Sequence, residues 1–261
     1  MLQSMHFTYN GKSSRDMGVT LVHEGGLYKD IFLPNRTLKE VKVNGKGRPY
    51  FKGVDINPLS FSLSFFIEEW EDRNNLRAIS RWLFQDYYKP LILDFSTEMI
   101  FYAIIEGNSE LIHNGCQEGY VTLNVRCDTY HTYSPLIPNY LEVRDSLSEE
   151  FFNEGDLDIR PQLKITKIGD GDISIKNELN EQEFILKGLY NNEVVLVNCE
   201  NEEIMSSFQK SLNRYLFDNH NDVWLDFEAQ TSAKFTFKGN FDCEFYYEYK
   251  YLNADRPIYD Y

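Results

Sequence analysis

The sequence has few of the features that most secreted, membrane and catalytic proteins require. Its four cysteines follow no disulfide or CxxC spacing in a chain of 261 residues, so we expect free, buried thiols in a reducing compartment. No apolar run approaches the ~20 residues of a membrane span, and the first residues do not show a signal-peptide pattern. The GxSxG, HExxH, P-loop and GxGxxG motifs are all absent from the sequence, so the common enzyme families that carry them are excluded.

Basic residues are also scarce. The chain has 26 Lys and Arg against 41 Asp and Glu, which gives a formal net charge of −15. This charge argues against nucleic-acid binding as a primary role, because phosphates must be neutralised by Lys and Arg. The deficit is uneven: residues 1–137 hold 14 basic and 16 acidic residues, whereas residues 138–261 hold 12 and 25. This asymmetry indicates two domains with different surroundings.

Aromatic residues are abundant, with 18 Tyr and 19 Phe beside only 8 Pro, and such a composition favours β-strands. In NPLSFSLSFFIEEW, residues 57–70, Leu and Phe alternate with Ser, which is typical of a strand with one dry and one wet face. Asn10-Gly11 predicts an earlier hairpin turn.

A single helix is predicted after this strand. Between Glu68 and Tyr88 the apolar spacing changes from 2 to about 3.6, and early acidic residues suit a helix N-terminus. Lys89-Pro90 is predicted to stop the helix. The residues expected on its buried stripe are Leu76, Ile79, Trp82 and Leu83.

Residues 36–56 predict a long second hairpin with its turn at Asn44–Gly47. The segment is strongly basic and has few large apolar residues, and a two-stranded ribbon with so little to bury is barely stable alone. We therefore expect it to lie against another subunit as an arm. The side chains predicted to form this oligomer interface are Lys39, Lys42, Lys46, Arg48, Tyr50 and Lys52.

The domain boundary is predicted near residue 137, because residues 132–156 carry two prolines and lose periodicity. Segment 204–216 is predicted to be a short helix or an irregular connection. Beyond the boundary, short strands recur at the spacing of an antiparallel sandwich. They are predicted at 161–168, 172–177, 183–188, 192–198, 223–228, 234–239 and 243–252. The predicted fold class is thus mainly β with one α-helix in the first domain, and two β-sandwich-type domains.

Possible catalytic carboxylate pairs are Asp94 with Glu98 and Asp226 with Glu228. Glycosidase chemistry needs two carboxylates at a set separation in a cleft, and in so acidic a chain a solvated surface explains both pairs. We predict no catalytic residues.

Two pairs of residues imitate zinc-ligand spacing: His113 with Cys116, and Cys127 with His131. The strand predicted between Cys116 and Cys127 would separate the pairs by about 30 Å, too far for one tetrahedral site. GDGD at 169–172 fits a tight turn better than a calcium loop. We predict no metal and no cofactor.

Aromatic residues near the C-terminus could form a core or a sugar platform. Phe245, Tyr247, Tyr249 and Tyr251 share one predicted face, which is typical of a core; Tyr246, Glu248 and Lys250 share the other. Trp224 fits either a core or a sugar site. The alternative function is therefore a carbohydrate-binding adhesin that recognises host cell-wall sugars through the second domain.

Several stretches occur in a family-like order: FTYNGKSSRDMGVTLV, RPYFKGVDINPLSFSLSFFI, LRAISRWL, KPLILDF, YAIIEG and GYVTLNVRC. The chain resembles the distal tail proteins (Dit) of siphovirus-type phages that infect Gram-positive bacteria. NEGDLDIRPQLKITKIGDGDISIKN, EFILKGLYNNEVVLVN and YEYKYL resemble that family's galectin-like C-terminal domain. A galectin sugar site would need an HxNxR pattern, which is absent here.

The resemblance implies a structural virion protein rather than an enzyme, made in the host cytoplasm and located at the phage tail tip. Residues 1–137 would form a homo-hexameric ring that joins the major tail tube protein to the baseplate. Residues 138–261 would dock the receptor-binding protein and a tail-associated tip or lysin protein. DNA would pass through the channel without specific binding, and no membrane contact is implied.

Overall fold

The computed structural model divides the chain into two compact units. Unit 1 comprises residues 1–133 and 251–261, and unit 2 comprises residues 134–250. The return to unit 1 falls within the short strand β19 (Lys250–Tyr251). The described residues are 6–22, 34–68, 70–94, 96–107, 110–113, 119–208 and 219–252. Cys116 and most of segment 204–216, two subjects of the sequence predictions, lie outside these ranges.

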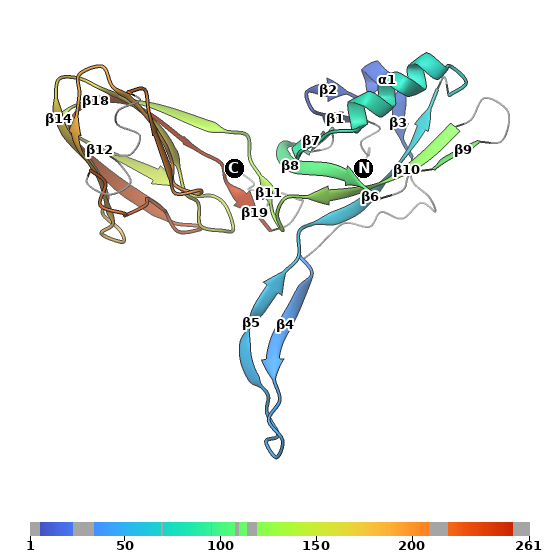
Figure 1. Ribbon diagram of the computed structural model, residues 1–261, viewed down its shortest axis with the longest axis horizontal. Coiled ribbons are helices and arrows are strands. Elements are labelled where there is room, and N and C mark those ends of the chain that lie inside the picture. Colours follow the sequence, from blue (N-terminus) through green and yellow to red (C-terminus); the bar gives the residue numbers. More distant parts are fainter. Residues whose placement is uncertain are drawn as a thin grey trace, which may run out of the picture. The chain divides into compact units, whose positions relative to one another are not determined.

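Unit 1 is built on a curled antiparallel sheet (Figure 1). Its strands are β1 (Phe7–Tyr9), β2 (Lys12–Ser13), β3 (Val19–Leu21), β6 (Ser60–Ile67), β7 (Lys89–Leu93), β8 (Ser96–Glu106), β9 (Leu111–His113), β10 (Gly119–Cys127) and β11 (Thr132–Tyr133). They run in the order β2-β1-β7-β8-β10-β6-β3, with β9 beside β10 and β11 beside β8. A 3-10 turn, η1 (Arg15–Met17), precedes β3.

Two sequence predictions in unit 1 are confirmed by local geometry. Asn10 and Gly11 have φ values of 49° and 73°, the left-handed pair that a two-residue hairpin turn requires between β1 and β2. On β6, Phe65 is buried while Ser60 and Ser62 are exposed, so the strand has the expected dry and wet faces.

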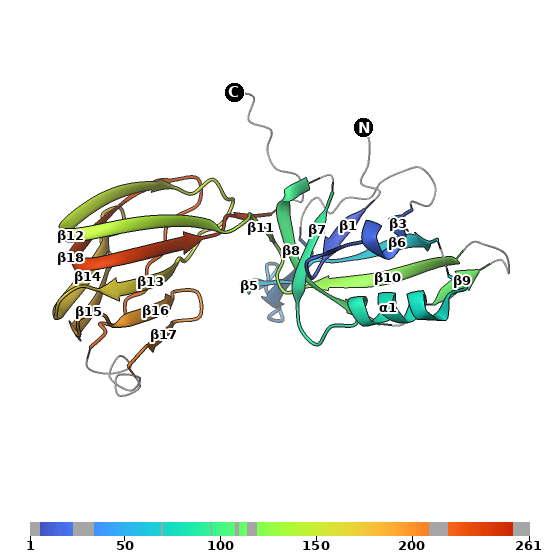
Figure 2. The same cartoon turned by 90° about the horizontal axis from the view of Figure 1, so that it is seen from above.

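Helix α1 (Arg73–Leu83) covers the dry face of this sheet (Figure 2). The Asp72 carboxylate accepts a hydrogen bond from the Asn74 backbone N–H at 2.8 Å and caps the first turn. Trp82 stacks on Phe7 with ring centroids 5.5 Å apart and donates its indole N–H to the Tyr9 carbonyl. The helix is thereby fixed to the core by both packing and a buried hydrogen bond.

The predicted end of the helix at Lys89-Pro90 was wrong. The apolar stripe is complete at Leu83, and Phe84 leaves the helix with extended backbone (φ −83°, ψ 98°) and an 84% exposed side chain. Lys89 and Pro90 already belong to β7. The proline therefore opens a strand, and loss of the buried stripe ends the helix.

Unit 2 is a second curled antiparallel sheet (Figure 2). Its strands are β12 (Ile137–Phe152), β13 (Gln162–Lys167), β14 (Gly171–Asn177), β15 (Glu183–Leu189), β16 (Val194–Asn198), β17 (Glu203–Ser206) and β18 (Ser232–Tyr247). The order is β15-β14-β18-β13-β16-β17, and β12 pairs with β18 along its whole length. The first half of β18 pairs with β14 and the second half with β13. The β12–β18 ribbon is therefore shared by two half-sheets that fold over one core.

This ribbon corrects two sequence interpretations. Residues 137–152, expected to be irregular, form one long strand, and the two strands expected at 234–239 and 243–252 merge into β18 up to Tyr247. The ribbon bends where Asp145 (φ 73°) faces Gly239 (φ 114°). A Cβ on Gly239 would lie 2.8 Å from the Asp172 carbonyl oxygen, so this glycine permits the close approach of β14.

The strand predicted at 223–228 was also wrong. Leu225 and Phe227 are fully buried, which produces the alternation, but Phe227 makes only an isolated bridge to Ile159. The Asn153 side chain donates to the Phe227 and Glu228 carbonyls. Side-chain amides thus satisfy this segment in place of a strand partner.

Phenylalanine dominates the core of unit 2. Phe151 and Phe245 stack with centroids 4.9 Å apart, and Phe235 and Tyr247 pack edge-on against both rings. Phe227 in turn packs edge-on against Phe235 and Tyr247. The predicted fold class, mainly β with two sandwich-like domains, is confirmed, whereas the galectin-like assignment stays a prediction. Within the described ranges, no helix is long and apolar enough to cross a bilayer.

Candidate assembly interface

The clearest candidate interface is a two-stranded ribbon formed by β4 (Arg36–Val41) and β5 (Tyr50–Ile56), hereafter the arm. It forms its own sheet and extends away from the rest of unit 1 (Figure 1). No residue of either strand is buried. Its base is closed by the Asn57 N–H, which donates to the Asn35 carbonyl at 3.0 Å. The ribbon has no core of its own and needs a partner surface to cover it.

One side of the arm carries four apolar side chains beside Arg36 and Glu40. Leu38 lies directly opposite Val54, and the neighbouring pairs place Ile56 and Phe51 on the same side. The exposed fractions of these four side chains are 60% for Leu38, 64% for Phe51, and 38% each for Val54 and Ile56. We name this set the apolar arm face. The opposite side carries an ion pair between Lys39 and Asp55, 2.5 Å apart.

The sequence-predicted interface residues all lie on the arm. Lys39 is paired as described, and Lys46 binds the Tyr50 hydroxyl and lies 4.9 Å from its ring centroid. Lys42 and Arg48 flank the turn, and Lys52 occupies the bulge in β5. All six are exposed. The structure brings them onto one ribbon, and their role in an interface stays a prediction.

Sequence reasoning missed most of the apolar arm face. Part of the signal was present as alternation, because Val54 and Ile56 are two residues apart. The pairing of Leu38 with Val54 depends on a bulge between Lys39 and Glu40, which the sequence does not reveal. The sequence prediction of the interface rested on the many Lys and Arg residues of this segment. An interface that is apolar on one side and basic elsewhere fits the exposed fractions better than a purely basic one.

The wet face of the unit 1 sheet is polar but carries little charge. Ser62 donates to the Asn124 side chain at 3.0 Å, and the Ser64 and Thr122 hydroxyls are 2.9 Å apart. An ion pair joins the neighbouring strands β8 and β10, with the Glu106 carboxylate and the Arg126 guanidinium 3.7 Å apart. This region is therefore rich in uncharged hydroxyl and amide groups, and the charges of Glu106 and Arg126 compensate each other.

Unit 2 presents a second exposed surface, on the outer side of β12, β18, β13, β16 and β17. Successive cross-strand partners form one row, which we name the outer row: Tyr140, Glu244, Lys164, Leu196 and Met205. Tyr140 is 72% exposed, Leu196 43% and Met205 54%. The Lys164 ammonium and the Glu244 carboxylate form an ion pair of 2.7 Å at the centre of the row. Apolar groups thus flank a neutralised pair on a sheet face.

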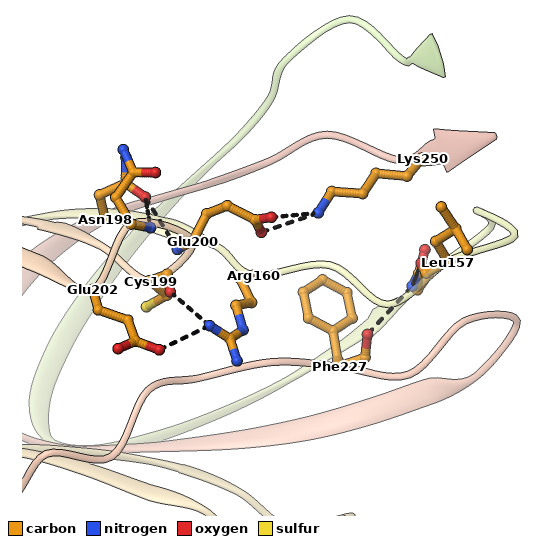
Figure 3. Close-up of polar contacts among 10 residues, drawn as sticks. Leu157, Arg160, Asn198, Cys199, Glu200, Glu202, Phe227 and Lys250 are labelled. Atoms are coloured by element: carbon orange, nitrogen blue, oxygen red, sulfur yellow. Dashed lines mark hydrogen bonds and ion pairs between the residues drawn. The ribbon is translucent and has the colours of Figure 1, made fainter. Parts of the chain in front are cut away.

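The β16–β17 turn at one end of this row is held by two ion pairs (Figure 3). Arg160 binds the Glu202 carboxylate at 3.2 Å and the Cys199 carbonyl at 3.5 Å. Lys250 binds both Glu200 carboxylate oxygens at 3.0 Å. The turn that joins Leu196 to Met205 is therefore fixed to the body of unit 2, although each exposed pair contributes little to stability alone.

Carboxylates considered for catalysis or for calcium binding accept hydrogen bonds from the protein itself. The Asp226 carboxylate accepts a hydrogen bond from the Asn180 side chain at 2.7 Å. Asp170 and Asp172 accept hydrogen bonds from the Asn191 and Gly188 backbone N–H groups. The GDGD segment is a bend at residues 169–170 that continues into β14, and its two carboxylates bind backbone N–H groups. Across the described residues, no group of three or more potential ligands is placed to hold a metal ion.

The described members of the two zinc-like pairs lie far apart. His113 faces Gly119 at one end of β10 and stacks on Trp70, whereas Cys127 is at the other end, eight residues or ~26 Å away along the strand. Burial, and to a smaller extent the Asp128 charge, raise the pKa of the Cys127 thiol to about 12. Cys127 is a free, protonated thiol in the core, as the sequence indicated.

The C-terminal aromatic set is core, as predicted. Phe245 is fully buried, and Tyr247, Tyr249 and Tyr251 are each at most 8% exposed. Trp224 is half-buried and packs against the His220 and Phe184 rings. Its ring therefore has a packing role on the side toward the sandwich core.

Comparison with known proteins gives consistent matches. Residues 2–129 match the family model described as phage tail protein N-terminal domain, and residues 137–249 match phage tail C-terminal domain. The chain is 31% identical over 255 residues to the SPbeta prophage-derived uncharacterized protein YomH of Bacillus subtilis strain 168, covering 96% of this chain and 99% of that protein.

Two solved structures have similar folds. The crystal structure of Dit from phage SPP1, described as a paradigm of the hub adsorption apparatus in phages that infect Gram-positive bacteria, has 12% identity and a TM-score of 0.70. The alignment covers 97% of this chain and 100% of that one. A chain of the phage P2 baseplate in its activated, calcium-bound conformation has 9% identity and a TM-score of 0.53, covering 95% and 98%. The resemblance to distal tail proteins is confirmed at the level of the fold, and the prediction of a structural protein rather than an enzyme is confirmed by the family. With both domain models matched and a relative at 31% identity over nearly its whole length, this chain belongs to the phage tail protein family.

Proposed function

We propose that the protein forms a closed, hexameric ring at the tip of a siphovirus-type tail. The observation that carries this proposal is the arm, whose apolar face is exposed in a single copy and which has no core of its own. A surface that binds a different surface on an identical chain generates either a ring or an open filament. The Dit-like fold of the chain supports the ring.

In this ring, unit 1 encloses the channel and the arm of each copy contacts the next copy. The hydroxyl-rich wet face around Ser62, Ser64 and Thr122 suits a channel wall. DNA passes such a wall without being retained, because retention needs uncompensated Lys and Arg. The ring joins the tail tube protein on one side to the tip on the other.

Unit 2 serves as the docking module of the proposed tip. Apart from the outer row, it exposes large apolar side chains of the kind that protein interfaces use, among them Phe152, Leu179 and Tyr190. The partners in this role are the receptor-binding protein and the tail-associated tip or lysin protein.

Two measurements test the proposal. Sedimentation velocity and negative-stain imaging of the purified full chain are expected to show a closed six-fold particle, and immunogold labelling of intact virions is expected to mark the tail end distal to the capsid. A chain that remains monomeric at every concentration, together with gold along the tail shaft or on the capsid, would refute the proposed role.

A further inference from the structure

We propose that the apolar arm face of one copy packs on the outer row in unit 2 of a second copy. The inference rests on the proposed ring and specifies the surface that receives the arm. It assigns to unit 2 a role in joining copies of the chain, in addition to docking other tail proteins.

Both surfaces are faces of β-sheets. The arm is a two-stranded ribbon with four apolar side chains on one side. The outer row crosses five adjacent strands, so it offers a sheet face broad enough to receive a ribbon face to face. Leu196 and Met205 are direct cross-strand neighbours there, which places two aliphatic side chains together for Phe51 and Leu38 to cover.

The charges of the two surfaces are opposite. Residues 34–57 contain six basic and two acidic residues, a net charge of +4, whereas residues 134–250 contain 11 basic and 23 acidic residues, a net charge of −12. Glu203 lies beside the outer row, and so does Glu142, which shares the Arg144 guanidinium with Asp242 and so leaves this group of three with an acidic excess. Opposite charges around an apolar centre accelerate association and set its orientation.

Other exposed apolar groups of the chain fit the arm less well. Phe84 and Tyr87, 84% and 69% exposed, lie on the irregular segment after α1, which offers no sheet to a ribbon. Ile112 and Tyr120 lie at the end of the nearly neutral wet face, where the basic arm has no opposite charge excess to meet. The outer row alone of these three combines a sheet face, exposed apolar side chains and acidic surroundings.

The outer row is also preorganised. The contacts of Arg160 and Lys250 fix the β16–β17 turn (Figure 3), so Leu196 and Met205 keep their positions before the arm arrives. A receiving surface that is already ordered loses less conformational entropy on binding.

Photo-crosslinking in the full chain tests the contact directly. Phe51 is replaced by benzoylphenylalanine, which keeps an aromatic ring, and isotopically heavy and light copies are mixed, assembled and irradiated. We expect heavy–light products that join position 51 to peptides containing residues 194–206 or Tyr140. Rings whose products join position 51 only to unit 1 overturn this inference and leave the proposed ring intact. A chain that never assembles overturns both.

A matched pair of variants provides an independent readout. Met205→Lys puts a cation on the outer row, where it meets the basic arm, and is expected to weaken self-association about tenfold, more strongly at low salt. Ser148→Lys adds the same charge at an exposed site on the other half of β12 and is expected to assemble like the wild type. Equal assembly of the two variants overturns the contact, and unchanged thermal unfolding of each confirms that the fold is intact.

Discussion

Removing the arm separates its role in assembly from any role in folding. The perturbation replaces residues 36–56, which include all four side chains of the apolar arm face, with a short Asn-Gly turn. Because no residue of β4 or β5 is buried, we expect the free energy of unfolding of each unit to change by less than about 0.5 kcal/mol. Thermal unfolding measured by circular dichroism at low protein concentration checks this first expectation.

The loss in self-association follows from the exposed fractions. The four side chains of the apolar arm face are on average about half exposed, and full burial of such a side chain stabilises by about 1.5–3 kcal/mol. Covering the remaining half of each therefore contributes roughly 3–6 kcal/mol per interface. The deletion should weaken association by roughly 10²–10⁴-fold, a change that sedimentation velocity and mass photometry resolve.

A matched pair of point variants locates the effect on one side of the ribbon. Val54 and Val41 are 38% and 39% exposed and lie on opposite sides of the arm. Val54→Ser is expected to weaken association by about three-fold, since it removes a half-exposed valine from the apolar arm face, whereas Val41→Ser leaves association unchanged. A deletion variant that assembles with wild-type affinity, or equal losses for the two serine variants, would contradict the reasoning.

Three further predictions concern the fold of unit 1. Gly119→Ala puts a Cβ 2.6 Å from the Trp70 Cβ and is expected to destabilise by about 1–3 kcal/mol in urea unfolding; wild-type stability would show that the tryptophan moves freely. Asp72→Ala removes the cap on the Asn74 N–H and is expected to cost about 1 kcal/mol, most of which Asp72→Ser restores; equal losses for both would rule out capping. Burial raises the pKa of Asp128 above its usual 3.8, so the folded state binds the proton more tightly and stability falls as the pH rises from 3.8 through the raised pKa. Asp128→Asn is expected to lack that fall when melting temperature is followed from acid to neutral pH, and a profile parallel to the wild type would refute this.

Sequence periodicity was informative wherever side chains decide the structure. The Ser and Leu/Phe alternation of β6 and the apolar stripe of α1 follow directly from the need to bury one face, and both are confirmed. The same reasoning failed at residues 223–228, because burial of Leu225 and Phe227 imitates a strand whose hydrogen bonds come from asparagine side chains.

A local sequence pattern does not reveal which distant strands pair with each other. Most residues of β12 are exposed and only Val143 and Phe151 are buried, so its alternation is weak, and the strand exists because β18 pairs with it throughout. The candidate interface was predictable as a ribbon from turn chemistry and charge. Its apolar face required the register between β4 and β5, which pairs Leu38 with Val54.

The shared ribbon of unit 2 also has an implication for how the two modules are connected. The chain enters unit 2 at Ser134 and leaves it at Lys250, and Ser134 and Tyr249 exchange hydrogen bonds in both directions, the Ser134 N–H to the Tyr249 carbonyl and the Tyr249 N–H to the Ser134 hydroxyl. The entering segment at Ser134 and the leaving segment at Tyr249 are thus adjacent, antiparallel neighbours. A pulling force on unit 2 acts on the start of β12 and the end of β18, which lie at the same end of the ribbon. Such a force does not separate the two strands one residue pair at a time. A segment whose entry and exit are adjacent can also be exchanged for another domain by rejoining the chain at two neighbouring points, which makes unit 2 a replaceable cassette.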